Sequence, residues 1–203
     1  LSKKMTPTKE QVKTGITLIV IGLFKKVIIG DTSGKFVDHI FGNLELYQSI
    51  EVISALMLFS IQIYADFSGY SSIARGTAKL LGVDLIRNFN QPYLSRNITE
   101  FWRRWHISLS LWLKDYLYFT LGGNKKGIYR TYLNLSITML LGGLWHGASW
   151  NFIVWGGLHG CYLSLHKIFL GTNKISSSKI SKITFRDVVS ICSTYLLVLF
   201  TWL

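Results

Sequence analysis

Charged side chains are scarce in this chain and make up only 16% of its 203 residues, against about 25% in soluble domains. This scarcity, with several long apolar runs, excludes an ordinary soluble domain and predicts a multi-pass membrane protein. Helices are the only plausible spanning elements for these runs, because backbone amides inside a bilayer must be hydrogen-bonded internally. We therefore expect an all-α fold, a polytopic integral membrane helical protein, as a single membrane-embedded domain over residues 1–203. The chain starts with Leu1 and stops inside an apolar run, so we expect a fragment of a longer chain.

Cysteine is also rare. The two cysteines, Cys161 and Cys192, both lie in apolar segments. They form neither a disulfide framework nor a metal-ligand spacing, so we expect them to pack as small hydrophobic residues. His159 and His166 lie seven positions apart and can share a helix face, but two histidines are an incomplete metal site. We expect these histidines to serve helix packing, and we predict no metal.

Acidic residues are few, with 10 Asp and Glu against 22 Lys and Arg and a formal net charge of +12. A basic chain can bind nucleic acid or an anionic membrane surface. Here the bases gather beside apolar runs, so membrane topology explains them better, and no nucleic-acid partner is expected. Because cytoplasmic loops carry excess Lys and Arg, residues 31–51, which hold four acids and one lysine, are expected outside. The segments expected in the cytoplasm are 1–13, 75–104, 124–130 and 172–186.

Aromatic residues are abundant between residues 98 and 121. Apolar and aromatic side chains recur there at steps of three and four, at Trp102, Trp105, Leu109, Trp112, Leu113 and Tyr116. That spacing predicts a helix with an apolar stripe, and its richness in Trp, Tyr and Arg suits the membrane interface. We expect an in-plane or re-entrant amphipathic helix around 98–121, which lets the other segments alternate across the membrane without conflict.

The longest stretch without Asp, Glu, Lys or Arg spans residues 131–166. A crossing needs about 20 residues, so we expect two crossings here with a break among the glycines at 142–147. His146 then lies at or near membrane depth, where an ionisable group is by default a functional-site hypothesis. The expected crossings of the chain lie near 15–30, 52–65, 132–144, 149–165 and 188–203.

Two features near these crossings leave alternatives open. Polar side chains also join helices in membranes, so His146 could instead hydrogen-bond across helices. The glycines would then serve only close packing; the pairs with the required spacing are Gly143 with Gly147 and Gly156 with Gly160. Lys25 and Lys26, inside the first crossing, could snorkel, face a cavity or mark the end of a short span.

Several segments in fixed order resemble the membrane-bound O-acyltransferases, most closely their bacterial branch that acetylates polysaccharides such as alginate. The matching segments are residues 64–71, 88–93, 101–110, 115–118, 121–124 and 143–150. The best-matching core covers residues 15–170. The resemblance implies a multi-pass helical enzyme with a funnel through the membrane, of which this chain would be the central part.

The resemblance also implies which histidines act. His146, in the Trp-His-Gly motif, corresponds to the essential histidine of similar proteins, and His106 to a second polar residue that assists or positions the donor. Attack of a hydroxyl on a thioester requires removal of its proton, and a neutral imidazole can accept it. General-base assistance of this kind contributes about 10²–10⁴ in rate.

Further residues are candidates for binding substrate or lining the funnel: Trp145, Asp66, Ser68, Asn88, Asn90, Arg103, Arg104 and Trp105. Asp66 follows a long uncharged run, so it either lines the funnel or marks the membrane exit beside Ser68. Arg103 and Arg104 could bind the phosphates of a donor, although a positive-inside anchor is the simpler interpretation. Turn chemistry alone explains Asn88 and Asn90.

The resemblance predicts an acyltransferase in the bacterial cytoplasmic (inner) membrane. It would transfer an acetyl group from a cytoplasmic thioester to hydroxyls of an exported polysaccharide, alginate-like or another cell-surface glycan. The donor would be acetyl-CoA or the phosphopantetheine of a carrier protein, with no tightly bound cofactor. Expected partners are the lipid bilayer, the polysaccharide acceptor, an extracytoplasmic acyltransferase and an acyl-carrier protein. The alternatives are D-alanyl transfer to teichoic acids, a membrane transporter or channel, and an inactive scaffold for polysaccharide export.

Overall fold

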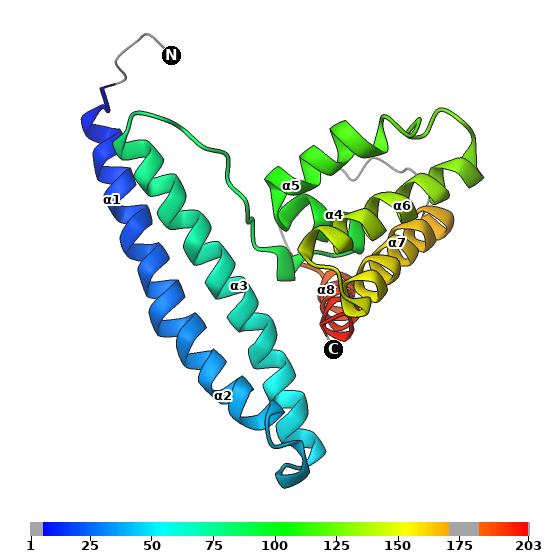
Figure 1. The fold of residues 1–203 in the computed structure, drawn as a ribbon, viewed down its shortest axis with the longest axis horizontal. Helices are drawn as coiled ribbons and strands as arrows, with labels where there is room; N and C mark the ends of the chain where they lie inside the picture. Colours follow the sequence, from blue (N-terminus) through cyan, green and yellow to red (C-terminus); the bar gives the residue numbers. More distant parts are fainter. Residues whose placement is uncertain (1–5, 171–182, 203) are drawn as a thin grey trace. The chain divides into compact units, whose positions relative to one another are not determined.

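The computed structural model describes residues 6–170 and 183–202, and the regular elements within these ranges are all helical (Figure 1). The predicted all-α fold is thereby confirmed. The chain divides into two compact units, of which the first ends at Asn88 and the second spans Phe89–Trp202. Part of the basic segments expected at 1–13 and 172–186, and the last residue of the final expected crossing, lie outside the described residues.

The first unit is an antiparallel pair of long helical segments (Figure 1). One segment runs without interruption through α1 (Lys9–Leu23), the π-helix η1 (Phe24–Gly30) and α2 (Asp31–Phe41). After the short 3₁₀-helix η2 (Leu44–Leu46), α3 (Ser49–Leu80) returns along it. Thr8 starts α1 with a capping box, in which its hydroxyl accepts the backbone N–H of Gln11, satisfying one of the first unpaired amides of the helix.

Glycines bring α1 and α3 into backbone contact. A methyl group placed on Gly76 would lie 2.5 Å from the carbonyl oxygen of Gly15, and one on Gly22 would lie 2.7 Å from that of Gly69. Both helices therefore present small residues seven positions apart along one seam. Membrane helices associate through such close packing, because lipid supplies no hydrophobic force between them.

In the second unit, three short helical segments replace the continuous helix expected over 98–121. They are α4 (Ile98–Arg104), α5 (Ile107–Trp112) and the π-helix η4 (Leu113–Tyr118), preceded by the 3₁₀-helix η3 (Pro92–Leu94). Trp105 has extended backbone angles and His106 has a φ of 42°, so neither continues the helix. The expectation of one helix is corrected accordingly, because the periodic apolar pattern runs across this break without revealing it.

The remainder of the second unit contains α6 (Ile128–His146), α7 (Trp150–Leu170) and α8 (Phe185–Phe200). The break predicted among the glycines at 142–147 is confirmed, since α6 ends at His146. Two of the glycines named for close packing, Gly143 and Gly156, do lie against the backbone of the neighbouring helix. A methyl group on Gly156 of α7 would lie 2.5 Å from the carbonyl oxygen of Met139, and one on Gly143 would lie 2.2 Å from that of Phe152.

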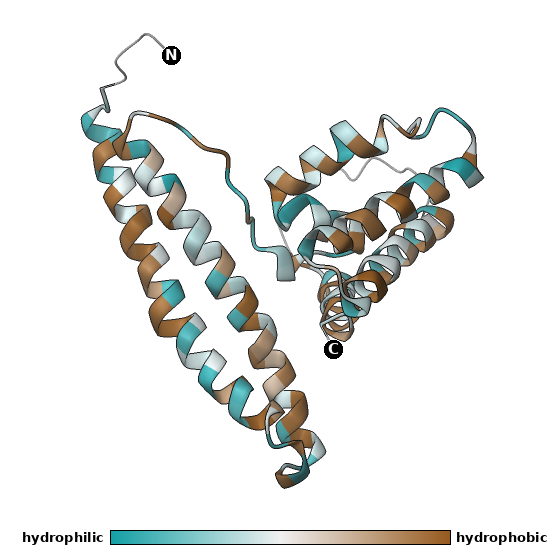
Figure 2. Cartoon of the chain, in the orientation of Figure 1, coloured by the Kyte–Doolittle hydropathy of each residue, from teal (hydrophilic) through white to brown (hydrophobic). Residues whose placement is uncertain are grey.

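Among the described residues, one helix, α3, is long and apolar enough to cross a membrane. Figure 2 shows apolar residues along much of its length. All of the expected crossings stay predictions, as does an in-plane or re-entrant placement of α4, α5 and η4.

Candidate active site

Three of the predicted site residues lie together in the second unit. The rings of His106 and Trp145 have centroids 6.3 Å apart in an edge-to-face arrangement, and those of Trp145 and His146 are 5.1 Å apart. These histidines are forty positions apart in the sequence, and the contact of His106, the N-cap of α5, with Trp145 of α6 brings their segments together.

His106 has a left-handed backbone, and its hydrogen bond identifies which ring nitrogen carries the proton. Its φ of 42° lies in the left-handed region, which is uncommon for a residue other than glycine and recurs at functional sites. Its Nδ1 accepts the backbone N–H of Leu109 at 3.3 Å, which caps α5. Since a backbone N–H only donates, the neutral ring carries its proton on Nε2. In this tautomer Nδ1 is the acceptor and Nε2 the donor of the ring.

His146 is exposed at the end of α6, beside two aromatic rings of α7. Its centroid lies 5.4 Å from that of Trp155, at an interplanar angle of 83°, and 5.8 Å from that of Phe152. Gly147 follows it as the C-cap and turns the chain toward α7. The imidazole is thus held among rings while remaining accessible to a substrate.

Trp105, directly before His106, anchors the break between α4 and α5. It is 5% exposed, its ring stacks on Phe101 at a centroid distance of 5.5 Å, and it meets the edge of Phe89 at 5.1 Å. Burial of this large ring offsets the cost of the left-handed residue that follows. Trp105 therefore supports His106 from inside the unit.

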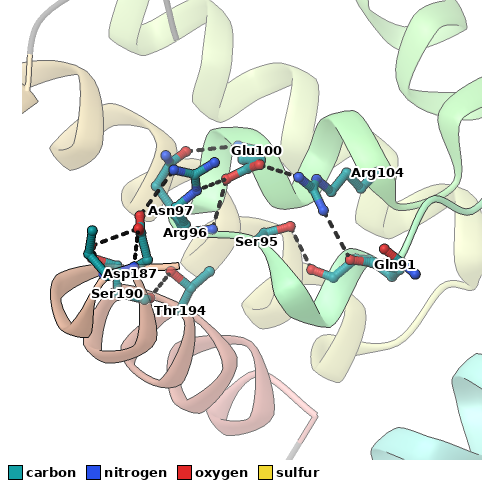
Figure 3. Close-up of polar contacts among 11 residues, drawn as sticks. Gln91, Ser95, Arg96, Asn97, Glu100, Arg104, Asp187, Ser190 and Thr194 are labelled. Carbon is teal, nitrogen blue, oxygen red and sulfur yellow. Dashed lines mark hydrogen bonds and ion pairs between the residues drawn. The ribbon is translucent and has the colours of Figure 1, made fainter. Parts of the chain in front are cut away.

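Arg104 belongs to an ion-pair network between α4 and α8 (Figure 3). Its guanidinium donates to the carboxylate of Glu100, which is 8% exposed, and reaches the carbonyl of Gln91 at 3.5 Å. Glu100 also accepts the backbone N–H of Arg96 at 2.8 Å, and the Arg96 guanidinium lies 3.0 Å from Asp187 in the first turn of α8. The charge of Arg104 is thus compensated inside the second unit.

The other candidates of the second unit differ in their surroundings. Arg103 is exposed, in contrast to Arg104. Asn90 is exposed and donates its backbone N–H to the carbonyl of Arg104 at 2.9 Å, so it holds the start of this unit against α4. Binding of a donor phosphate by Arg103 stays a prediction.

Asp66, Ser68 and Asn88 belong to the first unit. The carboxylate of Asp66 lies 2.9 Å from the ammonium of Lys26, which also lies 2.8 Å from Asp31. The space for this carboxylate depends on Gly30 in η1, where a methyl group would lie 2.2 Å from Asp66 Oδ1. Lys26 therefore has two acidic partners, and Asp66 joins the two long segments of the first unit.

Lys25 has different surroundings from its neighbour. Its ammonium lies 5.9 Å from the ring centroid of Tyr64, in a cation–π arrangement. Neither the partner of Lys25 nor that of Lys26 was identified from the sequence. The only local signal was the placement of two lysines within an apolar run, opposite an aspartate about forty positions later.

His159 was predicted to pack, and this is confirmed. It is fully buried in α7, with the ring of Trp155 at 4.7 Å and that of Trp102 at 5.1 Å. His166, seven residues further along α7, shares a hydrogen bond of 3.0 Å with the hydroxyl of Thr99. The sequence did not reveal that His159 lies in the same aromatic cluster as the ring that contacts His146. Among the described residues, no three of the His, Cys, Asp and Glu side chains are grouped as metal ligands.

Comparison with known proteins identifies the family of this chain. The family described as MBOAT, membrane-bound O-acyltransferase family, matches residues 1–195. The chain is 48% identical over 169 residues, 83% of its length, to a probable alginate O-acetylase of Pseudomonas putida. It is 46% identical over 155 residues, 76% of its length, to a peptidoglycan O-acetyltransferase of Helicobacter pylori. It is 32% identical over 171 residues, 79% of its length, to a teichoic acid D-alanyltransferase of Bacillus subtilis.

The match covers a limited part of each relative. The chain spans 35% of the length of the Pseudomonas protein, 29% of the Helicobacter protein and 42% of the Bacillus protein. His106, Trp145 and His146 all lie within the residues that match the family.

Proposed function

Because the chain belongs to the membrane-bound O-acyltransferase family, we propose that it holds the acyl-transfer centre of a longer bacterial membrane enzyme. This enzyme moves an acetyl group from a cytoplasmic thioester donor to hydroxyls of an exported polysaccharide. One observation carries the proposal: His106 and His146 both contact the ring of Trp145, at centroid distances of 6.3 and 5.1 Å. Two imidazoles so placed can act on one substrate group from different elements.

His146 is the general base. Its neutral imidazole accepts the proton of the acceptor hydroxyl while the hydroxyl oxygen bonds to the thioester carbonyl carbon. The tetrahedral intermediate then collapses, the carbon–sulfur bond breaks, and the imidazolium returns its proton to the leaving sulfur. The products are an ester, a free thiol and neutral His146, so atoms and charge balance. The exposure of His146 at the end of α6 is consistent with this role.

His106 complements this base as a donor. With Nδ1 accepting from the Leu109 backbone, Nε2–H can donate to the carbonyl oxygen of the thioester as negative charge develops on it. A preorganised donor of this kind contributes about 10²–10³ in rate. His146 and His106 therefore have opposite roles, one accepting a proton and the other stabilising an oxyanion.

Acetyl transfer to a polysaccharide is the first choice of reaction. Two relatives named for O-acetyl transfer are 48% and 46% identical to this chain, whereas the D-alanyltransferase is 32% identical. Acetyl-CoA and carrier-protein phosphopantetheine both present the required thioester, and the exposed guanidinium of Arg103 suits a donor phosphate. The proposal also includes several crossings of the cytoplasmic membrane, an acyl-carrier protein and an extracytoplasmic acyltransferase as partners.

The test compares ester-linked acyl groups on the exported glycans of four strains. These carry the intact full-length gene, a deletion, His146→Ala, or the control His39→Ala, with the variant proteins at matched membrane abundance. His39 lies in α2 of the first unit and contacts Tyr47, so its loss removes a histidine that has no proposed role in the reaction. We expect deletion and His146→Ala to lose acetate, and His39→Ala to retain it.

Each other outcome has a defined meaning. Loss of D-alanine in place of acetate selects the teichoic-acid reaction. Loss on deletion with retention in His146→Ala shows that the enzyme acts without His146 as its base. If no strain changes any acyl ester, the polysaccharide proposal is wrong, and solute flux through the protein is the next measurement.

A further inference from the structure

The interior of the second unit contains a histidine that the proposed reaction does not use. His159 is fully buried in α7. Four rings surround it: Trp155 at 4.7 Å, Trp102 at 5.1 Å, Tyr162 at 6.0 Å and Phe101 at 6.2 Å between centroids. A polar ring is costly at such a position unless its nitrogens are hydrogen-bonded.

Both nitrogens of His159 have partners, and their polarity is determined. The indole Nε1–H of Trp102 lies 3.3 Å from His159 Nδ1, and an indole can only donate, so Nδ1 is the acceptor. Nε2, 3.1 Å from the Thr201 hydroxyl, therefore carries the proton and donates it. The Thr201 hydroxyl in turn donates to the carbonyl of Val198 at 2.6 Å. One neutral tautomer satisfies every group in this chain of hydrogen bonds.

The partners of His159 connect the elements that hold both site histidines. Trp102 lies in α4, one turn before His106. Trp155 lies in α7, one turn before His159, and its ring contacts both His159 and His146. The His159 imidazole therefore lies between the segment that presents His106 and the ring that contacts His146.

Trp155 depends on this packing for its orientation. Its buried Nε1 makes no hydrogen bond to any of the described residues, so packing contacts hold the indole in place. His159 is the nearest of the rings around it at 4.7 Å between centroids, followed by His146 at 5.4 Å, Trp102 at 5.7 Å and Trp202 at 6.2 Å. A change in the tilt of His159 would therefore be transmitted to Trp155 and from there to His146.

We infer that His159 is a positioning residue, whose hydrogen bonds to Trp102 and Thr201 hold Trp155 against His146 and keep α4 aligned beneath His106. This inference rests on the proposed acyl transfer at His146. A displacement of about 1 Å at a reacting group can cost about 10²-fold in rate. Loss of the His159 hydrogen bonds should consequently lower the rate per folded molecule, beyond any loss of stability.

The experiment uses the full-length protein in its host and measures the initial rate of glycan acylation after induction, normalised to folded membrane abundance. His159→Phe keeps a ring but removes two hydrogen bonds, the one that the Trp102 indole donates to Nδ1 and the one that Nε2–H donates to the Thr201 hydroxyl. His159→Gln restores one acceptor and one donor. We expect His159→Phe to lose about 10²-fold in rate, and His159→Gln to recover at least about a tenfold part of that loss.

His166→Phe is the matched control. His166 lies on the same helix and also bonds to α4, through Thr99 at 3.0 Å. His166→Phe therefore also removes a hydrogen bond between α7 and α4, but at a histidine that is not among the described rings in contact with Trp155. If His159→Phe and His166→Phe fall equally per folded molecule, or if His159→Gln gives no recovery, the inference is wrong. If His159→Phe does not accumulate, Thr201→Val removes the acceptor of Nε2–H at nearly constant volume and should reproduce the loss; a normal rate in that variant overturns the inference.

His146→Ala in the same assay separates the two proposals. An inactive His146→Ala with a normal His159→Phe refutes only the positioning role. An active His146→Ala refutes the base proposed for the reaction, whatever His159→Phe does.

Discussion

The two units hold their helices together in different ways. In the first unit, glycines bring the backbones of α1 and α3 into direct contact, and Lys26 pairs with Asp31 of its own segment and with Asp66 across the helix pair. In the second unit, rings of Trp, Phe and His pack between α4 and α7, and Trp202, which follows α8, contacts Trp105 and Trp155. Backbone contact brings helices close but presents few reactive groups. Packing by rings fixes the orientation of imidazoles, and this is the unit in which His106 and His146 meet.

The largest effect is expected from substitution of His106, which has a left-handed backbone with a φ of 42°. His106→Gly and His106→Ala should both lower acyl transfer by about 10²-fold or more, because both remove the Nε2–H donor. Stability should separate them: glycine accepts a left-handed φ freely, whereas alanine there costs about 1–2 kcal/mol. The measurements are glycan acylation per folded molecule and the unfolding midpoint in detergent. Retained acylation in His106→Gly would show that the side chain has no part in the reaction.

The next largest effect tests backbone contact itself. Gly76→Ala should destabilise the first unit by about 1–3 kcal/mol, because the added methyl group would lie 2.5 Å from the Gly15 carbonyl oxygen. Gly156→Ala should do the same in the second unit, where the neighbour is the Met139 carbonyl oxygen, also at 2.5 Å. The matched control is Gly157→Ala, whose nearest neighbour is a Leu140 methyl at 3.7 Å.

Gly157→Ala should be neutral or slightly stabilising, since alanine favours a helix interior by about 0.5–1 kcal/mol over glycine. Denaturant unfolding of the detergent-solubilised protein measures all three variants. Equal stability of Gly76→Ala and Gly157→Ala would contradict the proposed close contact in the first unit.

A smaller effect is expected from the ion pair of the first unit. Both side chains are partly exposed in the unit, 44% for Lys26 and 33% for Asp66, and such pairs contribute up to about 1 kcal/mol. A double-mutant cycle with Lys26→Met and Asp66→Asn should give a coupling energy of that size in unfolding experiments. A coupling of zero would mean that pairing with Lys26 is not the role of Asp66 and would favour its place in the funnel.

The smallest effect is expected at Asp84, in the loop after α3. Hydrogen bonds from Lys79 and from the amide of Gln11 hold the pKa of its carboxyl below the usual 3.8. A depressed pKa stabilises the fold above the unfolded-state pKa, and this contribution is lost as the pH falls through the folded-state pKa. The intact protein should therefore exceed Asp84→Asn slightly in stability at neutral pH, and the difference should vanish in strong acid. A difference that grows toward low pH would contradict this account.

Much of the candidate site could be predicted because its signals are local. The glycines around His146 predicted that a helix ends there, and α6 does end at His146. Resemblance to a family singled out His106 and His146, and the structure brings both into contact with Trp145. The break at Trp105 and His106 could not be predicted, because the spacing of Trp102, Trp105 and Leu109 continues a helical pattern across it.

The sequence by itself determined that the chain is helical, poor in charge and arranged in apolar runs, since these properties depend on residues a few positions apart. It also indicated close helix packing at Gly143 and Gly156, but not at the glycines that join α1 and α3. Only the tertiary structure decided which histidine is exposed and which is enclosed: His146 is exposed at a helix end, whereas His159 is surrounded by rings and bonded to Trp102 and Thr201. The physical reason is that the partners of a side chain come from elements distant in the sequence, and only the packing of those elements brings them within hydrogen-bonding distance.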